Sequence, residues 1–278
     1  MAVWFITGAS AGLGEALARE ALAAGHEVVA AARSLARLES ALGDVVSGRL
    51  LLVELDVTDS VTIATSLAQA TARFGRLDVV VNNAGRGFVG AIEEASDSET
   101  RAVMETNFFG ALAVTRAVLP TLRAQRSGCI VMVSSFGGFT QPGAGSGIYG
   151  ATKFALEGAS EALRNEVRDL GVRVLVVEPG SFRTSFLEQG SMGVAAASID
   201  DYAGFMDVAR ERTRAASGTQ PGDPMRAAAA IVSVVDSGVD VFRLPLGEDA
   251  LAAVRAKLEQ VQGDVDRVTA LGLRTAHQ

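Results

Sequence analysis

The feature that most constrains the fold is an alternation of continuous apolar runs with segments of helical periodicity. Most runs are rich in Val, Ile or Leu, as strands are when both faces of a parallel sheet are covered. The runs are Val3–Ile6, Glu27–Ala32, Leu50–Leu55, Leu77–Val81, Ile130–Val133 and Val172–Val177. The helical segments between them are about 13–24, 35–42, 60–73, 98–124 and 149–169. Because parallel strands are joined by right-handed crossovers, this pattern predicts an α/β fold with a doubly wound parallel sheet and helices on both faces.

The pattern changes after residue 180. Residues 181–222 contain Gly, Ser, Asp, Phe and Met without one dominant period. Beyond them we expect a helix with Pro224 in its first turn, a short strand in "VFRLPLG" and an amphipathic C-terminal helix over about 248–270. The chain has 278 residues, of which 49% are hydrophobic, and this length favours one domain over residues 1–278.

The composition argues against several kinds of partner and site. A net charge of −7 gives no reason to expect nucleic acid or a membrane surface, and no apolar run approaches the ~18 residues that span a bilayer. Cys129 is the only cysteine, so no intrachain disulfide can form, and the N-terminus has no signal-peptide pattern. We therefore expect a cytoplasmic protein. With only His26 and His277 we expect no His-rich metal site; we expect Cys129 to pack beside a strand and His26 to lie at the surface.

A glycine-rich loop, "ITGASAGLGEAL", follows the first predicted strand and opens the first helix. Its spacing is T-G-x-x-x-G-x-G. Glycines allow a tight turn and a close approach of a pyrophosphate, and the helix N-terminus supplies free N–H donors. The alternative is an ordinary strand–helix turn, but the position at the first junction favours a nucleotide site. The expected contacts are Gly8, Ser10, Ala11, Gly12, Leu13 and Gly14.

The end of the second strand indicates which dinucleotide binds. An acidic residue there would bond the ribose 2′-OH of NAD, but this chain has Ala32 followed by Arg33. A guanidinium binds a 2′-phosphate, so we expect NADP (NADPH), with an ordinary surface arginine as the alternative. Ser34 adds a hydroxyl and Arg37 a further charge. After the third strand, Asp56 is expected to accept from the adenine amino group with Val57 supplying backbone, unless Asp56 caps the next helix.

Five further motifs follow in order, four of them at predicted strand ends, where ligands bind in such sheets. They are "NNAG" from Asn82, "TNFFG" from Thr106, "SSFGG" from Ser134, "YGATK" from Tyr149 and "PGSFRT" from Pro179. In these motifs and in the glycine loop, the chain resembles the short-chain dehydrogenase/reductase family. The resemblance is close over residues 2 to about 184 and looser over about 223–246. The resemblance implies a Rossmann-like sheet of about seven strands in the order 3-2-1-4-5-6-7. The cofactor-binding part would be about 1–145, and a substrate-covering segment about 181–222.

The resemblance also implies the catalytic set. Tyr149 matches the acid/base, and Lys153 stands four residues later on the same helical face, where its ammonium would lower the phenol pKa and reach the nicotinamide ribose. Without the surrounding motifs, this pair would be a weak helix-surface contact. Ser135 matches the serine that steadies the substrate oxygen, with Ser134 as the alternative. Asn107, in the middle of a predicted helix, matches the asparagine of a water-mediated proton relay.

The remaining matches concern the cofactor. Asn82 and the backbone at Ala84 and Gly85 match the stretch that borders the adenosine ribose and stabilises the sheet centre. The turn after the sixth strand would contact the nicotinamide, and Tyr149 and Lys153 would contact the cofactor as well. The implied residues of these two stretches are Asn83, Ala84, Gly85, Pro179, Gly180, Phe182 and Thr184.

These matches predict an NADP(H)-dependent oxidoreductase that interconverts a carbonyl and an alcohol. Alternatives are another reaction on the same scaffold (epimerisation, dehydration or dehalogenation) and a non-catalytic NADP-binding sensor. Apolar side chains beside the motifs and in the covering segment favour a hydrophobic substrate, although they are equally the packing of a lid. They are Phe88, Phe136, Phe139, Phe182, Phe186, Leu187, Met192, Ile199, Tyr202, Phe205 and Met206. "RLPLGED" replaces the family's V-D-G-G strand of the tetramer contact, so we expect a homodimer through helices 98–124 and 149–169.

Overall fold

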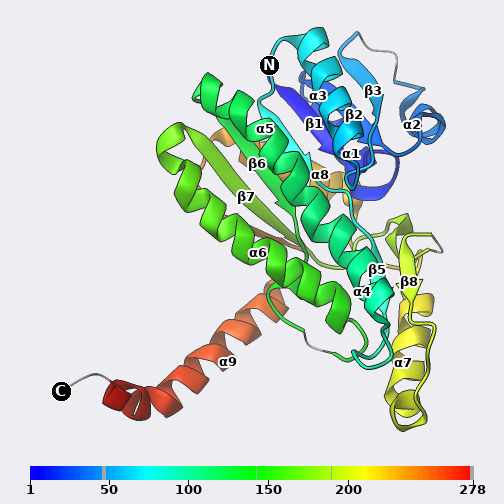
Figure 1. The fold of residues 1–278 in the computed structure, drawn as a ribbon, viewed down its shortest axis with the longest axis vertical. Coiled ribbons are helices and arrows are strands. Elements are labelled where there is room, and N and C mark those ends of the chain that lie inside the picture. The colour runs from blue at the N-terminus through cyan, green and yellow to red at the C-terminus, as the bar shows by residue number, and fades with distance from the viewer. Residues whose placement is uncertain (46–47, 142, 189, 276–278) are drawn as a thin grey trace.

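The computed structural model describes residues 1–45, 48–141, 143–188 and 190–275. Within them lies a seven-stranded parallel sheet of order β3-β2-β1-β4-β6-β7-β9 (Figure 1). This Rossmann-like order is the predicted one when the strands of this sheet are counted along the chain. The strands are β1 (Val3–Thr7), β2 (Glu27–Ala32), β3 (Leu50–Glu54), β4 (Val79–Asn82), β6 (Gly128–Val133), β7 (Val172–Pro179) and β9 (Arg243–Leu246).

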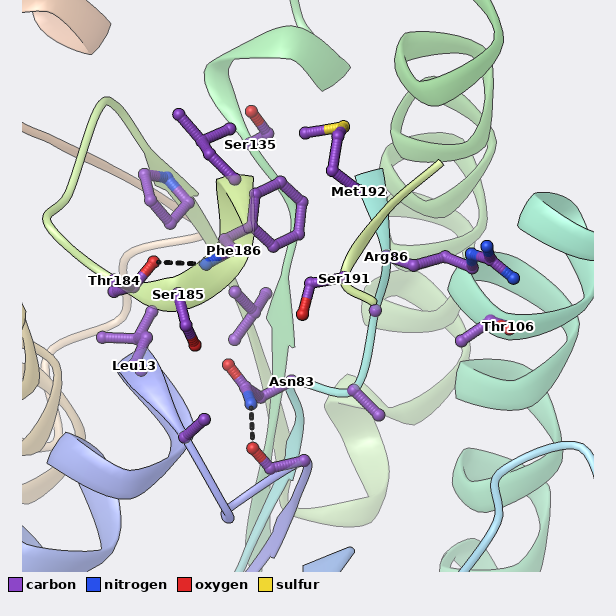
Figure 2. A pocket seen from close by; sticks show the side chains of 18 of the residues that line it. Leu13, Asn83, Arg86, Thr106, Ser135, Thr184, Ser185, Phe186, Ser191 and Met192 are labelled. Carbon is purple, nitrogen blue, oxygen red and sulfur yellow. Dashed lines mark hydrogen bonds between the residues drawn. The ribbon is translucent and has the colours of Figure 1, made fainter. Parts of the chain in front are cut away.

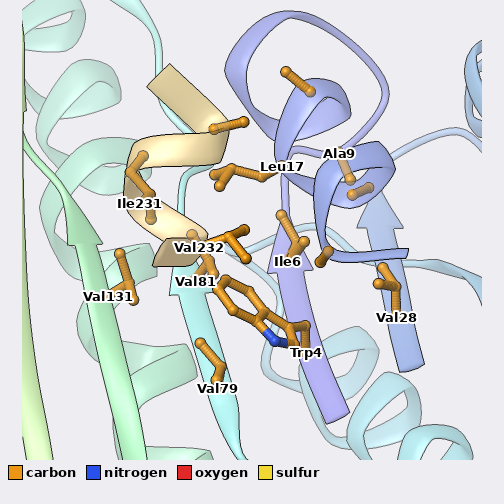
Figure 3. Close-up of a cluster of buried hydrophobic side chains, with 14 of the residues drawn as sticks. Trp4, Ile6, Ala9, Leu17, Val28, Val79, Val81, Val131, Ile231 and Val232 are labelled. Carbon is orange, nitrogen blue, oxygen red and sulfur yellow. The ribbon is translucent and has the colours of Figure 1, made fainter. Parts of the chain in front are cut away.

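Helices cover both faces of the sheet, as predicted. Because side chains alternate along a strand, Trp4 and Ile6 of β1 face one side and Phe5 the other. Trp4 and Ile6 pack with Ile231 on the first side (Figure 3). That side is covered by α1 (Gly12–Ala23), α2 (Leu35–Leu42) and α8 (Pro224–Ser237). The other is covered by α3 (Ser60–Phe74), α5 (Ala111–Gln125) and α6 (Gly147–Val167).

The helix predicted over 98–124 is divided in the structure. It consists of α4 (Asp97–Met104), a π-helical turn over Glu105–Gly110, and α5. Such turns are rare and often mark functional sites, and this one contains Asn107. The whole run Asp97–Gln125 has the length and composition of a membrane span. Its apolar residues are interrupted by polar ones, so it does not stand out in the sequence as a continuous apolar run. Its apolar side packs on the sheet, and core helices of globular proteins meet the same test.

The segment 181–222 contains structure that the sequence did not reveal. A short strand β8 (Met192–Val194) pairs in parallel with β5 (Gly87–Val89), and α7 (Asp200–Ala216) follows. The carboxylate of Glu94 is buried and accepts hydrogen bonds from Arg210 of α7 (2.8 Å) and from the N–H groups of Ala91 and Ile199 (3.1 and 3.2 Å). These hydrogen bonds, led by that from Ala91, lower the pKa of Glu94. The segment is therefore tied to the chain that follows β5.

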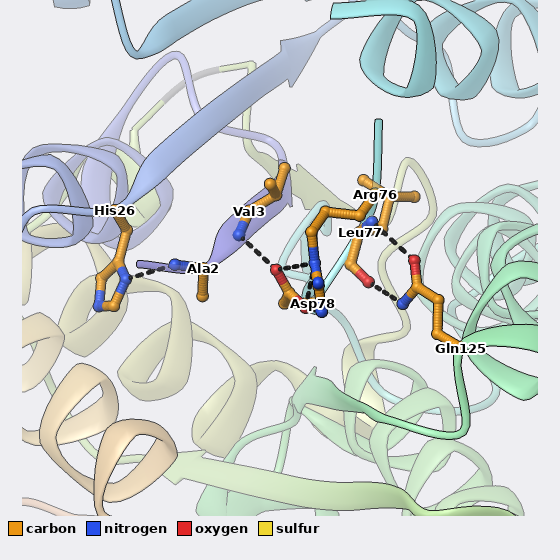
Figure 4. Close-up of polar contacts among 7 residues, drawn as sticks. All are labelled: Ala2, Val3, His26, Arg76, Leu77, Asp78 and Gln125. Atoms are coloured by element: carbon orange, nitrogen blue, oxygen red, sulfur yellow. Dashed lines mark hydrogen bonds and ion pairs between the residues drawn. The ribbon is translucent and has the colours of Figure 1, made fainter. Parts of the chain in front are cut away.

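The amino ends of the strands are joined by polar contacts (Figure 4). Asp78 accepts from the N–H of Val3 at 2.9 Å and pairs with Arg76, which connects the start of β1 to the start of β4. His26 was expected at the surface, and this is wrong. Its ring is buried, its Nδ1 accepts from the N–H of Ala2 at 3.2 Å, and its Nε2 lies 2.9 Å from Asp236.

Cys129 lies buried in β6, as expected of a packing residue. Burial raises the pKa of its thiol to about 11, so the group is a neutral thiol at ordinary pH.

The C-terminal helix, predicted over about 248–270, is α9 (Glu248–Gly272). It begins directly after β9 and extends away from the rest of the molecule (Figure 1).

The core contact between α5 and the sheet provides a test of the packing. Leu122 is fully buried, and its Cδ2 would lie 2.8 Å from a Cβ placed on Gly128 of β6. We expect Leu122→Ala to lower the free energy of unfolding by about 2–5 kcal/mol in urea denaturation, because it leaves a cavity. Val61→Ala, at a side chain that is 69% exposed, should change it by less than about 0.5 kcal/mol. Equal effects of the two substitutions would contradict this packing.

Candidate active site

A cavity of about 920 Å³ lies at the carboxyl ends of the central strands (Figure 2). It is lined by the glycine loop after β1, by segments after β2, β3, β4, β6 and β7, and by part of the 181–222 segment. Carboxyl ends of parallel strands share one edge of a sheet, so motifs far apart in the sequence meet here. The strand-end positions of the motifs in the sequence predict this meeting.

The glycine loop has the shape that a diphosphate requires. Gly8 and Gly12 have φ values of 68° and 59°, which glycine adopts without strain. A Cβ on Gly14 would lie 2.3 Å from the carbonyl oxygen of Gly8, so only glycine fits there. Helix α1 begins after Ala11, which has no side chain that could cap it. Among the described residues, no side chain caps the first N–H groups of α1, so they remain available to an anion. The loop therefore fits the pyrophosphate of a dinucleotide.

Thr7 joins the ends of β1 and β4 beneath this loop, and it was not identified from the sequence. Its hydroxyl accepts from the N–H groups of Asn83 and Ala84, both at 3.0 Å, and donates to Val81 O at 3.1 Å. The Asn83 amide in turn donates to Thr7 O at 2.9 Å. The sequence signal that could have identified Thr7 is its position at a strand end, directly before the first glycine of the loop. Asn82 was expected to border the adenosine ribose, but it does not line the cavity; its amide is buried and donates to Thr115 Oγ1 at 3.0 Å.

The part of the cavity beside the ends of β2 and β3 is lined by the residues expected to hold the adenosine. Arg33 and Arg37 line it, and neither guanidinium has a hydrogen bond or ion pair with the described residues. Ser34 also lines it, but its Oγ caps α2 by accepting from the N–H of Arg37 at 3.3 Å. Asp56 accepts from the N–H and hydroxyl of Thr58, at 2.9 and 2.7 Å. The cap of α3 is Asp59, so the alternative role expected for Asp56 is wrong.

Tyr149 and Ser135 meet at the other end of the cavity. Burial raises the pKa of the Tyr149 phenol to about 12, and a hydrogen bond with Ser135 acts in the opposite direction. This is contrary to the lowering by Lys153 that we expected: desolvation is the largest cause of the shift, and the hydrogen bond with Ser135, not the ammonium, opposes it. Ser134 instead lies near Glu157. Both side chains are next to Gly138: a Cβ placed there would lie 2.5 Å from Ser134 Oγ and 3.1 Å from Glu157 Cγ.

The ammonium of Lys153 is buried behind Tyr149. Its Nζ donates to Val133 O at 2.8 Å and lies 5.9 Å from the centroid of the Tyr149 ring. Burial lowers the pKa of Lys153 to about 8, while the carboxylate of Glu157 raises it. Lys153 is therefore still mostly protonated at neutral pH.

Glu157 joins this lysine to a second buried carboxylate. It pairs with Arg243 of β9, whose guanidinium also lies 2.9 Å from Glu178 of β7. Burial raises the pKa of Glu157, and Arg243 opposes that shift. None of these three residues was identified from the sequence, because only the tertiary structure brings β7, β9 and α6 together. We infer that Arg243 compensates two buried carboxylates.

Asn107 is buried in the π-helical turn, and its amide spans three segments. Its Oδ1 accepts from the N–H of Arg86 and its Nδ2 donates to Arg86 O, both at 2.8 Å. Nδ2 also donates to Thr152 Oγ1 of α6 at 3.0 Å. Asn107 does not itself line the cavity. It fixes α6, and hence Tyr149 and Lys153, relative to the end of β4.

The turn after β7 lines the cavity with Pro179, Gly180, Phe182 and Thr184, as predicted. Thr184 packs against Gly12, whose Cβ would lie 3.1 Å from Thr184 Cβ.

Asp249, at the start of α9, holds this turn in place. It accepts from the N–H of Ser181 at 2.8 Å, and a Cβ on Gly180 would lie 2.0 Å from its Oδ1. The sequence carried no local signal for this contact, because Asp249 lies far along the chain.

The residues expected to cover the substrate divide into two groups. Most of those near the motifs and at the start of the segment line the cavity, and Phe186 packs obliquely against Tyr149 with ring centroids 5.8 Å apart. Phe139, beside the Ser134–Gly138 motif, and the later residues of α7 and its approach do not line it. The lining residues are Phe88, Phe136, Phe182, Phe186, Leu187 and Met192, whereas Phe139, Ile199, Tyr202, Phe205 and Met206 do not line it.

The part of the chain that the structure describes contains no group of three His, Cys, Asp or Glu residues able to hold a metal ion. His277 lies outside the described residues.

Comparisons with known proteins agree with this geometry. A family model described as short chain dehydrogenase matches residues 2–192. The chain is 35% identical over 275 residues to "Oxidoreductase BOA17" of Botryotinia fuckeliana, covering 99% of each chain. It is 39% identical over 198 residues to a 3-ketodihydrosphingosine reductase of Bacteroides thetaiotaomicron, covering 71% of this chain and 70% of that one.

Solved structures show the same fold over the whole chain. A short-chain dehydrogenase from Streptomyces avermitilis superposes with a TM-score of 0.90 at 39% identity, covering 99% of this chain and 100% of that one. Other solved neighbours are complexes with NAD or with NADP+.

The buried lysine can be tested directly, because Lys153 and Lys257 are the only lysines. In protein labelled with ¹³C at lysine Cε, we expect the Lys153 signal to titrate near pH 8. Lys257→Arg assigns the two signals. Glu157→Gln should move the Lys153 pKa lower, because it removes the negative charge that favours the ammonium.

Glu161→Gln is the matched control, since this carboxylate lies on the same helix and is 65% exposed. It should leave the Lys153 titration almost unchanged. A Lys153 signal that responds equally to both substitutions would show that Glu157 has no special influence on the lysine.

Proposed function

The chain belongs to the short-chain dehydrogenase family, and from this premise we propose that it is an NADP(H)-dependent oxidoreductase acting on an apolar ketone or aldehyde and the corresponding alcohol. The observation that carries the proposal is the meeting of Tyr149 and Ser135 in the cavity that the glycine loop also lines. A dinucleotide bound there would supply or accept the hydride. A proton donor and a dinucleotide cradle in one cavity are what carbonyl reduction requires.

Tyr149 is the proton donor in this proposal. A phenol with a pKa of about 12 is protonated at neutral pH, so it can give a proton to a substrate oxygen. Ser135 donates a hydrogen bond to the same oxygen and so favours the charge that develops there. The ammonium of Lys153, which is itself buried, then stabilises the phenolate that remains.

Arg33 supports NADP as the cofactor. Its guanidinium is exposed at the cavity and has no partner among the described residues, so it is available to a 2′-phosphate. Arg37 adds a second positive charge to the same wall. The 2′-phosphate would thus meet two arginines there.

The apolar walls support a hydrophobic substrate. Phe186, Leu187 and Met192 line the cavity, and Phe186 packs against Tyr149. A relative is named for the reduction of 3-ketodihydrosphingosine. We therefore propose that the carbonyl carries an apolar chain or ring. NADPH consumption across ketones and aldehydes of increasing apolar length tests this. Substrate conversion without net NADPH consumption would favour epimerisation or another reaction on the same scaffold.

The proton donor is tested by Tyr149→Phe. We expect kcat to fall by about 10²–10⁴-fold, because the proton source is lost, while the Kd for NADPH measured by fluorescence remains similar. Tyr202→Phe is the matched control, since Tyr202 is the only other tyrosine and its hydroxyl bonds Glu93 outside the cavity. Near-normal kcat in the Tyr149 variant would refute the mechanism.

The cofactor preference is tested by Arg33→Ala. Loss of a charge-assisted contact should lower kcat/KM for NADPH by about 10–100-fold and leave kcat/KM for NADH almost unchanged. Arg116→Ala removes the same charge from an exposed arginine of α5 and should affect neither. Wild-type protein that uses NADH as well as NADPH would contradict the proposed preference.

A further inference from the structure

Helix α9 presents apolar side chains to solvent along almost its entire length. Of Glu248–Gly272, all within the described residues, only Ala250 is buried. Figure 1 shows the helix extending away from the sheet, so its later turns lie clear of the sheet and its covering helices in the part of the chain that the structure describes. Isolated helices are marginal in water, and Gly263 in the interior lowers its stability further. The exposed fraction reaches 54% at Leu258 and 55% at Val268.

These apolar residues recur at alternating spacings of three and four. That is the heptad pattern of a coiled coil, in which the a and d positions form a seam against a partner helix. The seam residues are Leu251, Val254, Leu258, Val261, Val265 and Val268. Leu251 is 40% exposed, Val261 44% and Val265 52%, so the seam is an unpaired surface of this chain.

We propose that the seam is covered by α9 of a second copy, packed antiparallel about a two-fold axis. When Leu258 of each helix lies opposite Val261 of the other, the charged residues beside the seam come into register. Lys257 of each copy then faces Asp264 of the other, which gives two opposite-charge pairs. Arg255 of each copy faces Gln262 of the other, so no like charges meet.

A parallel pairing fits less well. In that arrangement Lys257 would face Gln262 and Asp264 would face Thr269, so neither charge would gain an opposite partner. The body of the protein is joined to the start of α9, and two parallel helices would bring both bodies to the same end (Figure 1). Antiparallel helices place the bodies at opposite ends of a helix that is about 37 Å long.

The charges also disfavour a membrane as the covering surface. Helix α9 contains five acidic residues (Glu248, Asp249, Glu259, Asp264 and Asp266) and three basic ones (Arg255, Lys257 and Arg267). Interfacial helices are usually rich in Lys and Arg on their polar face, and this one is not.

The two residues of the proposed charge pair are free to form it. Lys257 Nζ lies 3.3 Å from Gln260 Oε1, and Asp264 pairs with Arg267 on the same helix. Both contacts are exposed and local, and such contacts contribute little to stability. They can therefore rearrange when a partner helix packs against the seam.

The interface is tested by Leu258→Asp, with Ala256→Asp as the matched control. Both add one negative charge to exposed positions of α9, but Ala256 lies opposite the seam. We expect the mass from light scattering to halve for Leu258→Asp and to stay at the wild-type value for Ala256→Asp. The halving is expected whether or not the long helices α5 and α6 form a second interface, which would turn a dimer into a tetramer.

The antiparallel geometry is tested by exchanging charges. Lys257→Asp and Asp264→Lys each create two like-charge pairs, and each should raise the Kd of the α9 contact by about tenfold. The double variant restores the pairs with opposite polarity and should return the Kd to near the wild-type value. Residues seven apart on one helix do not touch, so this rescue would come from the second copy.

Three outcomes would overturn the proposal. The first is a wild-type mass equal to one chain, the second is an unchanged mass for Leu258→Asp, and the third is a double variant no tighter than the single ones. Binding of a monomeric wild-type protein to neutral phosphatidylcholine vesicles would assign the seam to lipid instead. Far-ultraviolet circular dichroism and thermal unfolding of each variant show that the body remains folded.

Discussion

The buried ammonium of Lys153 requires neighbouring groups that hydrogen-bond it and compensate its charge. A charge removed from water is costly unless it is hydrogen-bonded and paired. Here Val133 O accepts from it, and Glu157 provides the opposing charge. Glu157 then needs Arg243, which in turn compensates Glu178. The contacts that compensate this one buried lysine thus come from β6, α6, β7 and β9, so the last strand of the sheet contributes to its surroundings.

The opposite end of the cavity is organised by the backbone rather than by charge. Thr7 and Asn83 bind the ends of β1 and β4 together, and Gly14 lets the start of α1 approach Gly8. The free N–H groups of α1 then face the cavity. In the proposed function, the end with Tyr149 supplies the proton, and the end with the glycine loop would receive the diphosphate of a dinucleotide. Asn107 links the segment after β4 to α6 through its hydrogen bonds with Arg86 and Thr152.

Much of the fold was predictable because its signals are local. Buried parallel strands are continuous apolar runs, so β1 to β4, β6 and β7 were recognisable, and Pro224 marked the start of α8. The elements that were missed are short, such as β5 and β8, or are held by distant partners, as α7 is by Glu94. His26 was misassigned because its burial depends on Asp236 of α8, far along the chain.

The sequence by itself determined the order of the strands and helices, the loop that fits a diphosphate, and the spacing of Tyr149 and Lys153. Those properties depend on residues close together in the chain. Only the tertiary structure decided the electrostatics of the site. Burial raises the pKa of Tyr149 and lowers that of Lys153, whereas the sequence led us to expect a lowered phenol pKa. Desolvation depends on every segment packed around a group, and no pattern within one segment contains that information.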